Sequence, residues 1–183
     1  MDITFTGIRF NGPIDIVDSG AAREARVVLY QCMIVNTGGE AFTVANIAGE
    51  SLNITLVNCV LNVRNLLSAD SVSEIWFLAR DCQMRLGGGV GTGNAGLLFG
   101  STHTYYADVR DCHLWNSATI AATFFSGISP YLILHNSTLE GSGTAASELI
   151  NIVPATDSFT QLNISGNVLE NVTSSGIGIT IRS

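Results

Sequence analysis

The sequence contains no lysine and few charged residues of any kind. Its eight basic residues are all arginine, charged residues make up 13% of the 183-residue chain, and the formal net charge is −7. Binding to nucleic acid or to an anionic membrane surface requires a basic patch, so the composition argues against both partners. The absence of lysine also excludes a lysine base and a Schiff-base mechanism.

Long apolar runs and paired metal-binding cysteines are missing as well. No apolar segment reaches the roughly 18 residues of a membrane-spanning helix, and the first residues lack the basic and apolar segments of a signal peptide. The four cysteines lie 23 to 30 residues apart, a spacing that matches no zinc motif. We therefore expect no metal and no cofactor, and we expect buried, reduced thiols, which suit folding in a cytosol.

The chain does contain a repeat, which becomes visible when it is aligned on the cysteines. Seven copies have a key residue at intervals of 23 to 30 residues, namely Ile8, Cys32, Cys59, Cys82, Cys112, Ser137 and Asn167. The residues five and three positions before each key residue are apolar, and this alternation predicts a strand with one buried face. The residue just before the key is Gly, Asn or Asp in all copies but one, which predicts a sharp left-handed turn.

A second apolar segment separates the copies. It occupies residues 14–16, 42–44, 65–67, 97–99, 119–121, 149–151 and 177–179. A repeat of this length cannot bury its own apolar face, so the copies must stack. A β-sandwich also has short, regularly spaced strands, but the recurring turn residue and small inward residue favour a stack. We predict that residues 1–183 form a single all-β domain, either a whole protein or a segment of a longer chain, with the cysteines in one interior column.

These copies, such as residues 53–61 (Asn-Ile-Thr-Leu-Val-Asn-Cys-Val-Leu), resemble those of a known superfamily. The resemblance is to the pectin-lyase-like superfamily, which includes pectate lyases, polygalacturonases and phage tailspikes, and it covers nearly the whole chain. It implies a right-handed, single-stranded parallel β-helix of about seven coils. It implies no particular activity, because the polygalacturonase-type motifs Asn-Thr-Asp, Asp-Asp, Gly-His-Gly and Arg-Ile-Lys are absent.

Charged residues gather at outward positions of the fourth and fifth copies. Asp81 and Asp111 share a column, so their carboxylates are expected about 5 Å apart, the separation found in retaining glycosidases. The same column holds Asn58 and Asn136, however, so the turn alone also accounts for aspartate there, and we favour that interpretation. The sequence thus predicts ligand-binding residues Arg80, Arg110, Asp108 and His113, with an open alternative in which the catalytic residues are Asp81, Asp111, Arg80 and Arg110.

Two groups of large side chains are also expected to face outward. An apolar stripe along the predicted axis marks an interface between identical copies, formed by Val28, Tyr30, Met33, Val57, Val60 and Leu78. Phage tailspikes of the superfamily are homotrimers, so the resemblance implies a trimer. The second group consists of aromatic side chains. They either form a glycan groove beside Arg80, Arg110, His103 and His113 or cover a core or an interface. The members of this group are Trp76, Tyr105, Tyr106, Trp115, Phe124, Phe125 and Tyr131.

The sequence and the resemblance together favour a non-enzymatic function. The first hypothesis is a structural or adhesive β-helix of a phage virion, in a tailspike, fibre or capsid-attached protein, that binds host-surface carbohydrate or other virion proteins. Such a chain would be made in the host cytoplasm and reside in the virion. The alternative is a polysaccharide lyase or glycoside hydrolase acting near Asp81 and Asp111. A third hypothesis is an exported bacterial adhesin fragment at the cell surface or outside the cell.

Overall fold

The computed structural model describes residues 1–17, 24–45, 51–69, 74–86, 95–98, 104–116, 122–128, 131–141, 150–153, 161–170 and 179–181. All regular structure in these residues is β-strand. The strands are β1 (Asp2–Thr6), β2 (Arg9–Asn11), β3 (Ile14–Val17), β4 (Ala25–Tyr30), β5 (Met33–Ala45), β6 (Ser51–Val57), β7 (Val60–Ala69), β8 (Glu74–Arg80), β9 (Gln83–Leu86), β10 (Ala95–Leu98), β11 (Thr104–Arg110), β12 (His113–Asn116), β13 (Ala122–Ile128), β14 (Tyr131–His135), β15 (Thr138–Glu140), β16 (Ile150–Val153), β17 (Gln161–Ser165), β18 (Val168–Glu170) and β19 (Ile179–Ile181). Within this part of the chain there is accordingly no helix with the length and apolar character needed to cross a membrane.

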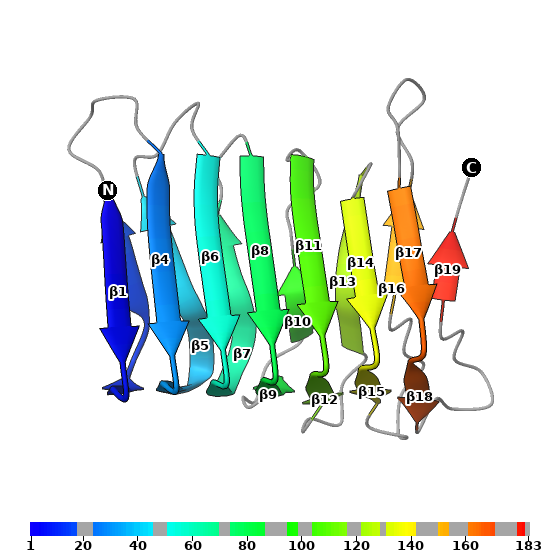
Figure 1. The fold of residues 1–183 in the computed structure, drawn as a ribbon, viewed down its shortest axis with the longest axis horizontal. Coiled ribbons are helices and arrows are strands. Elements are labelled where there is room, and N and C mark those ends of the chain that lie inside the picture. The colour runs from blue at the N-terminus through cyan, green and yellow to red at the C-terminus, as the bar shows by residue number, and fades with distance from the viewer. Residues whose placement is uncertain are drawn as a thin grey trace.

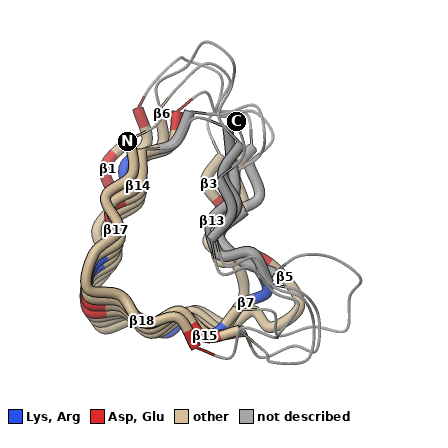
Figure 2. Tube along the Cα trace, turned by 90° about the vertical axis from the view of Figure 1, so that its right-hand side faces the viewer, with Lys and Arg blue, Asp and Glu red and all other residues tan. Residues whose placement is uncertain are grey.

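The strands stack side by side into two parallel sheets (Figure 1). The first sheet has seven strands in the order β1-β4-β6-β8-β11-β14-β17. The second sheet has twelve strands, from β18 through β9 and β7 to β19, with β2 and β3 joined to it through β5. Seen along the stacking axis, β17, β18 and β3 lie on three different sides of the coil (Figure 2). The chain is therefore a parallel β-solenoid, which confirms the predicted fold class.

The first sheet buries the predicted apolar columns. One column passes from Ile3 through Val27, Ile54 and Phe77 to Ala107, each residue pairing in register with the next strand. The residues two positions later form a second inward column that includes Leu29, Leu56 and Leu134, which are fully buried. Burial of apolar area contributes roughly 25 cal/mol per Å², so these columns hold the rungs together. The predicted alternation is confirmed.

Every rung of the first sheet ends in the predicted left-handed turn. The seven residues before the key position have φ values from 48° to 67° and are Gly7, Gln31, Asn58, Asp81, Asp111, Asn136 and Gly166. The backbone stays paired through the turn, because the N–H of each non-glycine residue among them donates to a carbonyl of the next rung, as Asn58 does to Arg80 at 2.9 Å. A left-handed residue other than glycine costs about 1–2 kcal/mol, less for Asn and Asp, which explains the composition of this column.

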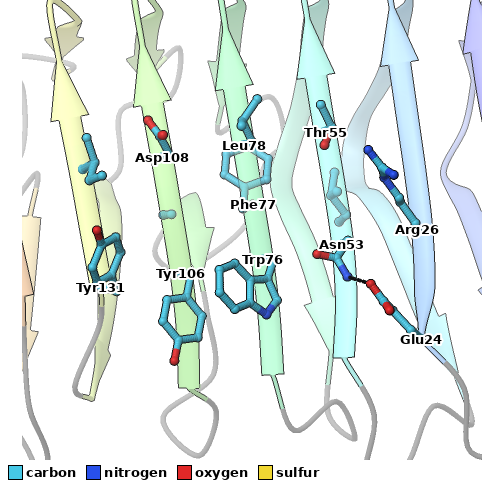
Figure 3. A pocket seen from close by; sticks show the side chains of 13 residues that line it. Glu24, Arg26, Asn53, Thr55, Trp76, Phe77, Leu78, Tyr106, Asp108 and Tyr131 are labelled. Atoms are coloured by element: carbon cyan, nitrogen blue, oxygen red, sulfur yellow. Dashed lines mark hydrogen bonds between the residues drawn. The ribbon is translucent and has the colours of Figure 1, made fainter.

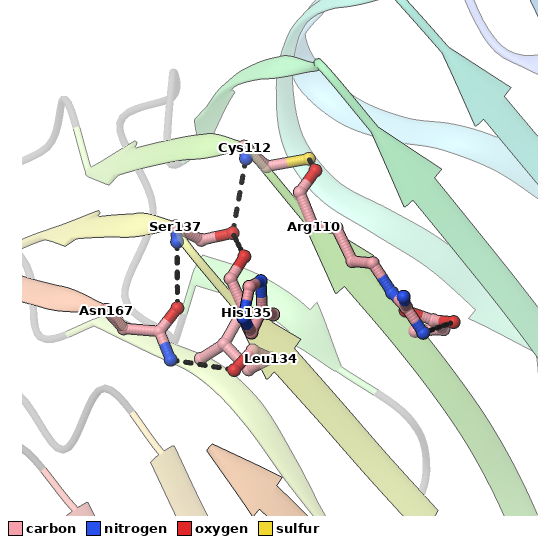
Figure 4. Close-up of polar contacts among 7 residues, drawn as sticks. Arg110, Cys112, Leu134, His135, Ser137 and Asn167 are labelled. Atoms are coloured by element: carbon pink, nitrogen blue, oxygen red, sulfur yellow. Dashed lines mark hydrogen bonds and ion pairs between the residues drawn. The ribbon is translucent and has the colours of Figure 1, made fainter. Parts of the chain in front are cut away.

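The cysteines and Ser137, the key residues of the inner rungs, lie one above another in the interior, whereas Ile8 of the first rung is 40% exposed. The backbone N–H of Cys59 donates to Sγ of Cys82 at 3.5 Å, and the N–H of Cys112 donates to Oγ of Ser137 at 3.1 Å. The N–H of Ser137 in turn donates to Oδ1 of Asn167 at 2.8 Å (Figure 4). All four cysteines are buried and unbridged, which confirms the predicted column.

Hydrogen bonding and burial keep the central thiols protonated. A side-chain hydrogen bond with Cys82, followed by burial, raises the pKa of Cys59 far above its usual value. A side-chain hydrogen bond with Cys112 raises the pKa of Cys82 to about 12, whereas the same contact lowers the pKa of Cys112. Because the thiolate is the reactive form of cysteine, Cys59 and Cys82 are inert packing groups at neutral pH.

Candidate functional site

The outer face of the first sheet carries a row of aromatic side chains, which we call the aromatic ladder. It consists of Trp76 on β8, Tyr106 on β11 and Tyr131 on β14, which are register partners on successive strands. The ring centroids of Trp76 and Tyr106 lie 4.0 Å apart with an interplanar angle of 10°, and those of Tyr106 and Tyr131 lie 5.6 Å apart at 43°. The ladder faces outward because it alternates along each strand with inward residues such as Phe77.

A groove runs along the aromatic ladder, and we call it the ladder groove (Figure 3). Its volume is about 510 Å³. Its outward lining comes from β4, β6, β8, β11 and β14 and from the residue before β4, so the groove follows the stacking axis and crosses the strands. The lining side chains on this face are Glu24, Arg26, Asn53, Thr55, Trp76, Leu78, Tyr106, Asp108, Tyr131 and Ile133.

Trp76 offers one open ring face to this groove. Tyr106 covers the face that is turned toward β11, because the two rings are nearly parallel and in contact. The opposite face is turned toward β6, where the register partner of Trp76 is the short side chain Asn53. Trp76 is consequently 44% exposed, although it lies in the middle of the sheet.

Polar side chains surround the open face of Trp76. Nδ2 of Asn53 donates a hydrogen bond to Oε1 of Glu24 at 2.7 Å. Arg26 is the register partner of Asn53 on β4. The ion pairs among the described residues are Asp108–Arg110 and His113–Glu140, so Arg26 has no ionic partner in this part of the chain. This end of the ladder groove therefore presents hydrogen-bond donors and acceptors beside an aromatic surface.

Three of the four predicted ligand-binding residues share this face, and the fourth does not. Nε and Nη2 of Arg110 donate to the two carboxylate oxygens of Asp108 at 2.6 and 2.9 Å, and this contact raises the pKa of Arg110. Arg80 is exposed and is the register partner of Arg110. His113 lies beyond the turn on the second sheet, where Nε2 is 3.3 Å from Oε2 of Glu140.

The structure places Asp81 and Asp111 on adjacent rungs at the turn. Both residues are exposed, and both line a shallow hollow of about 430 Å³ together with His113. Their left-handed backbone accounts for the choice of aspartate without a catalytic role. In the described part of the chain, no group of three or more His, Cys, Asp or Glu residues is arranged to hold a metal ion.

The predicted apolar stripe bends around the column of left-handed turns, at the rungs of Gln31 and Asn58. Tyr30 and Val60 are 42% and 37% exposed, but they lie on the first and the second sheet respectively. Val28 is only 6% exposed, so it adds little surface to the stripe. Val57, the register partner of Tyr30, and Met33, the register partner of Val60, are half-buried.

The structure places the predicted aromatic cluster on both sheets, and the lining of the ladder groove includes residues that were not predicted. Trp115 lies on the second sheet, with its ring centroid 4.9 Å from that of His113. The side chains of Tyr105, Phe124 and Phe125, and residue His103, lie outside the described part of the structure. Glu24, Arg26 and Asn53 were not predicted, although Arg26 and Asn53 occupy the column of Trp76, six positions before the key residue.

In comparisons with known proteins, no family model, no curated protein and no solved structure matches this chain. The functional argument therefore depends on the geometry of the ladder groove and on the chemistry of its lining.

Proposed function

We propose that the protein is a non-enzymatic carbohydrate-binding module whose ladder groove holds a linear glycan. The observation that carries this proposal is a groove lined by the aromatic ladder and by several polar side chains, with one face of Trp76 open. Sugar rings have an apolar C–H face that packs on an aromatic ring, and hydroxyl groups that require polar partners. A groove that is mainly apolar and aromatic, with a few placed polar groups, matches both requirements.

The direction of the ladder groove favours a chain over a single small ligand. The groove crosses five strands, so it extends along about four strand spacings, or roughly 19 Å at about 4.8 Å each. A linear oligosaccharide lying parallel to the stacking axis would contact successive rungs of the aromatic ladder. Asp108 on β11 lies toward the far end of this path and would accept hydrogen bonds from hydroxyl groups there.

We also propose that this module belongs to a phage virion, in a tailspike, fibre or capsid-attached protein. The support is the resemblance of the cysteine-centred repeat to the pectin-lyase-like superfamily, in which phage tailspikes bind host-surface carbohydrate. A carbohydrate-binding solenoid is consistent with that role.

Alanine in place of Trp76 is expected to weaken glycan binding strongly. Loss of the indole removes the open stacking face and one wall of the groove, and a loss of about 1.4 kcal/mol corresponds to a tenfold weaker affinity. The test is a screen of the protein on an array of bacterial surface polysaccharides, followed by biolayer interferometry of the hits. We expect at least about a tenfold rise in Kd for W76A.

Trp115→Ala is the matched control for this measurement. Trp115 is the other tryptophan of the chain and lies on the second sheet, so its loss should leave the affinity unchanged. Equal affinities of W76A and the unchanged protein would contradict the proposal. Glycan cleavage that is lost in Asp81→Asn or Asp111→Asn would instead support the lyase or hydrolase alternative.

We further propose that identical copies associate side by side through Tyr30, Val57, Met33 and Val60, as a trimer. The support is the exposure of Tyr30, just before the left-handed turn of its rung, and of Val60, just after the turn of the next rung. Light scattering at micromolar concentration is expected to give three times the 19.3 kDa chain mass, and Tyr30→Asp is expected to lower it to that of one chain. A single-chain mass for the unchanged protein would refute this association. Ser165→Asp, in the same outward column but on β17 at the other end of the sheet, is the control that should remain a trimer.

A further inference from the structure

Trp76 and Arg26 are separated by two strand spacings on the outer face of the first sheet. Arg26, Asn53 and Trp76 occupy the same outward column on β4, β6 and β8. Two strand spacings of about 4.8 Å place the two outer residues roughly 9.6 Å apart. A ring that contacts a wall on each side at about 4.0–4.5 Å needs roughly 8–9 Å between the walls. The space is thus wide enough for one ring and too narrow for two.

The residue between these walls leaves room for such a ring. Asn53 has a short side chain, and its amide is bound to Glu24 at 2.7 Å (Figure 3). This hydrogen bond directs the amide toward Glu24, at the start of β4. We propose that a single uncharged pyranose ring of the glycan inserts between Trp76 and Arg26, above Asn53. This inference depends on the proposed function and identifies the class of sugar that the groove selects.

The polar groups around this slot match hydroxyl groups better than ionised groups. Glu24 only accepts hydrogen bonds, Arg26 only donates them, and Asn53 does both. Vicinal hydroxyls of a pyranose donate and accept at once, so they satisfy all three side chains. A sugar carboxylate would be attracted by Arg26 and repelled by Glu24, and the ammonium group of an amino sugar would experience the reverse, so a charged group gains little from the slot while it loses part of its hydration. The slot therefore selects an uncharged ring with free vicinal hydroxyls.

Tryptophan fluorescence tests this inference directly. The chain has two tryptophans, so Trp115→Phe leaves Trp76 as the only indole reporter. Titrations of this variant use methyl glucoside, methyl mannoside and methyl galactoside, with glucuronic acid and glucosamine as the charged counterparts. We expect a saturable change in Trp76 emission with at least one neutral pyranoside, and at least tenfold weaker responses to both charged sugars. The converse variant, Trp76→Phe, has Trp115 as reporter and should not respond.

Two further variants test the residues of the slot. Arg26→Gln and Asn53→Leu are each expected to weaken the response to the neutral pyranoside at least tenfold, with circular dichroism unchanged. Stronger binding of a charged sugar, or an undiminished response in both variants, would overturn the inference. If a polysaccharide binds and W76A abolishes that binding, but no single sugar changes Trp76 emission, the inference is overturned while the proposed function stands. If no polysaccharide binds at all, both are overturned.

Discussion

Replacing Phe77 by alanine is expected to lower the free energy of unfolding by about 3–5 kcal/mol, the usual cost of removing a buried aromatic side chain. Phe77 is 2% exposed and lies in the inward column between Ile54 and Ala107. Its neighbour Ala107 is small, so it cannot fill the space that the ring leaves. Because small domains have a total stability of about 5–15 kcal/mol, the variant should unfold at a much lower urea concentration, measured by far-UV circular dichroism.

Trp76→Ala is the matched control, because Trp76 is the preceding residue on the same strand and faces the opposite side. Its loss removes the ring contact with Tyr106 and leaves the core intact, so we expect a cost of no more than about 1.5 kcal/mol. A shift of register by one residue would exchange the roles of these two side chains. Equal costs for the two variants, or a greater cost for W76A, would therefore contradict the register of the first sheet.

The first sheet was predictable because two independent constraints repeat in every copy. The inward positions must be apolar at period two, as at Ile54 and Leu56, and the turn must accept a left-handed backbone, as at Asn58. Only Gln31 departs from the residue types that favour this backbone, and it still adopts a φ of 52°. The hydrogen bonds of the neighbouring rungs evidently impose the turn there, which local propensity alone does not predict.

The third side of the coil was less predictable. The apolar segment 119–121 was expected to be a strand, but it lies outside the described residues, and the strand of that rung is β13, in which Phe125 pairs with Leu97. The segments between copies differ in length, and surface loops accept insertions at little thermodynamic cost. Spacing from the cysteine therefore cannot determine the register after a loop of variable length.

The candidate site was predictable in part. Aromatic residues and the charged residues Arg80, Asp108 and Arg110 were expected on outward positions, and the structure places three aromatics on the same face as these three. Extending the alternation one step further toward the strand start would have placed Arg26 and Asn53 in the column of Trp76. The parallel stacking of Trp76 on Tyr106, which leaves one indole face open, depends on side-chain rotamers and could not be obtained from spacing.

Alanine in place of Asn167 is expected to lower the free energy of unfolding by about 2–4 kcal/mol, since each buried polar group left unpaired costs about 1–3 kcal/mol. Oδ1 of Asn167 accepts from the N–H of Ser137 at 2.8 Å, and Nδ2 donates to the carbonyl of Leu134 at 2.7 Å (Figure 4). The alanine variant leaves both backbone groups without this partner. Asn163→Ala, an exposed asparagine on β17, should change the stability by less than about 0.5 kcal/mol.

The chain itself supplies a rescue variant for this position. Ser137 occupies the same column one rung earlier, where its Oγ accepts from the N–H of Cys112 at 3.1 Å and donates to the carbonyl of His135 at 3.0 Å. Asn167→Ser is therefore expected to restore at least half of the stability that the alanine variant loses, as measured by urea denaturation. If serine and alanine at position 167 were equally destabilising, the hydrogen bonds of this column would not contribute to stability. The stack would then depend on the apolar columns alone.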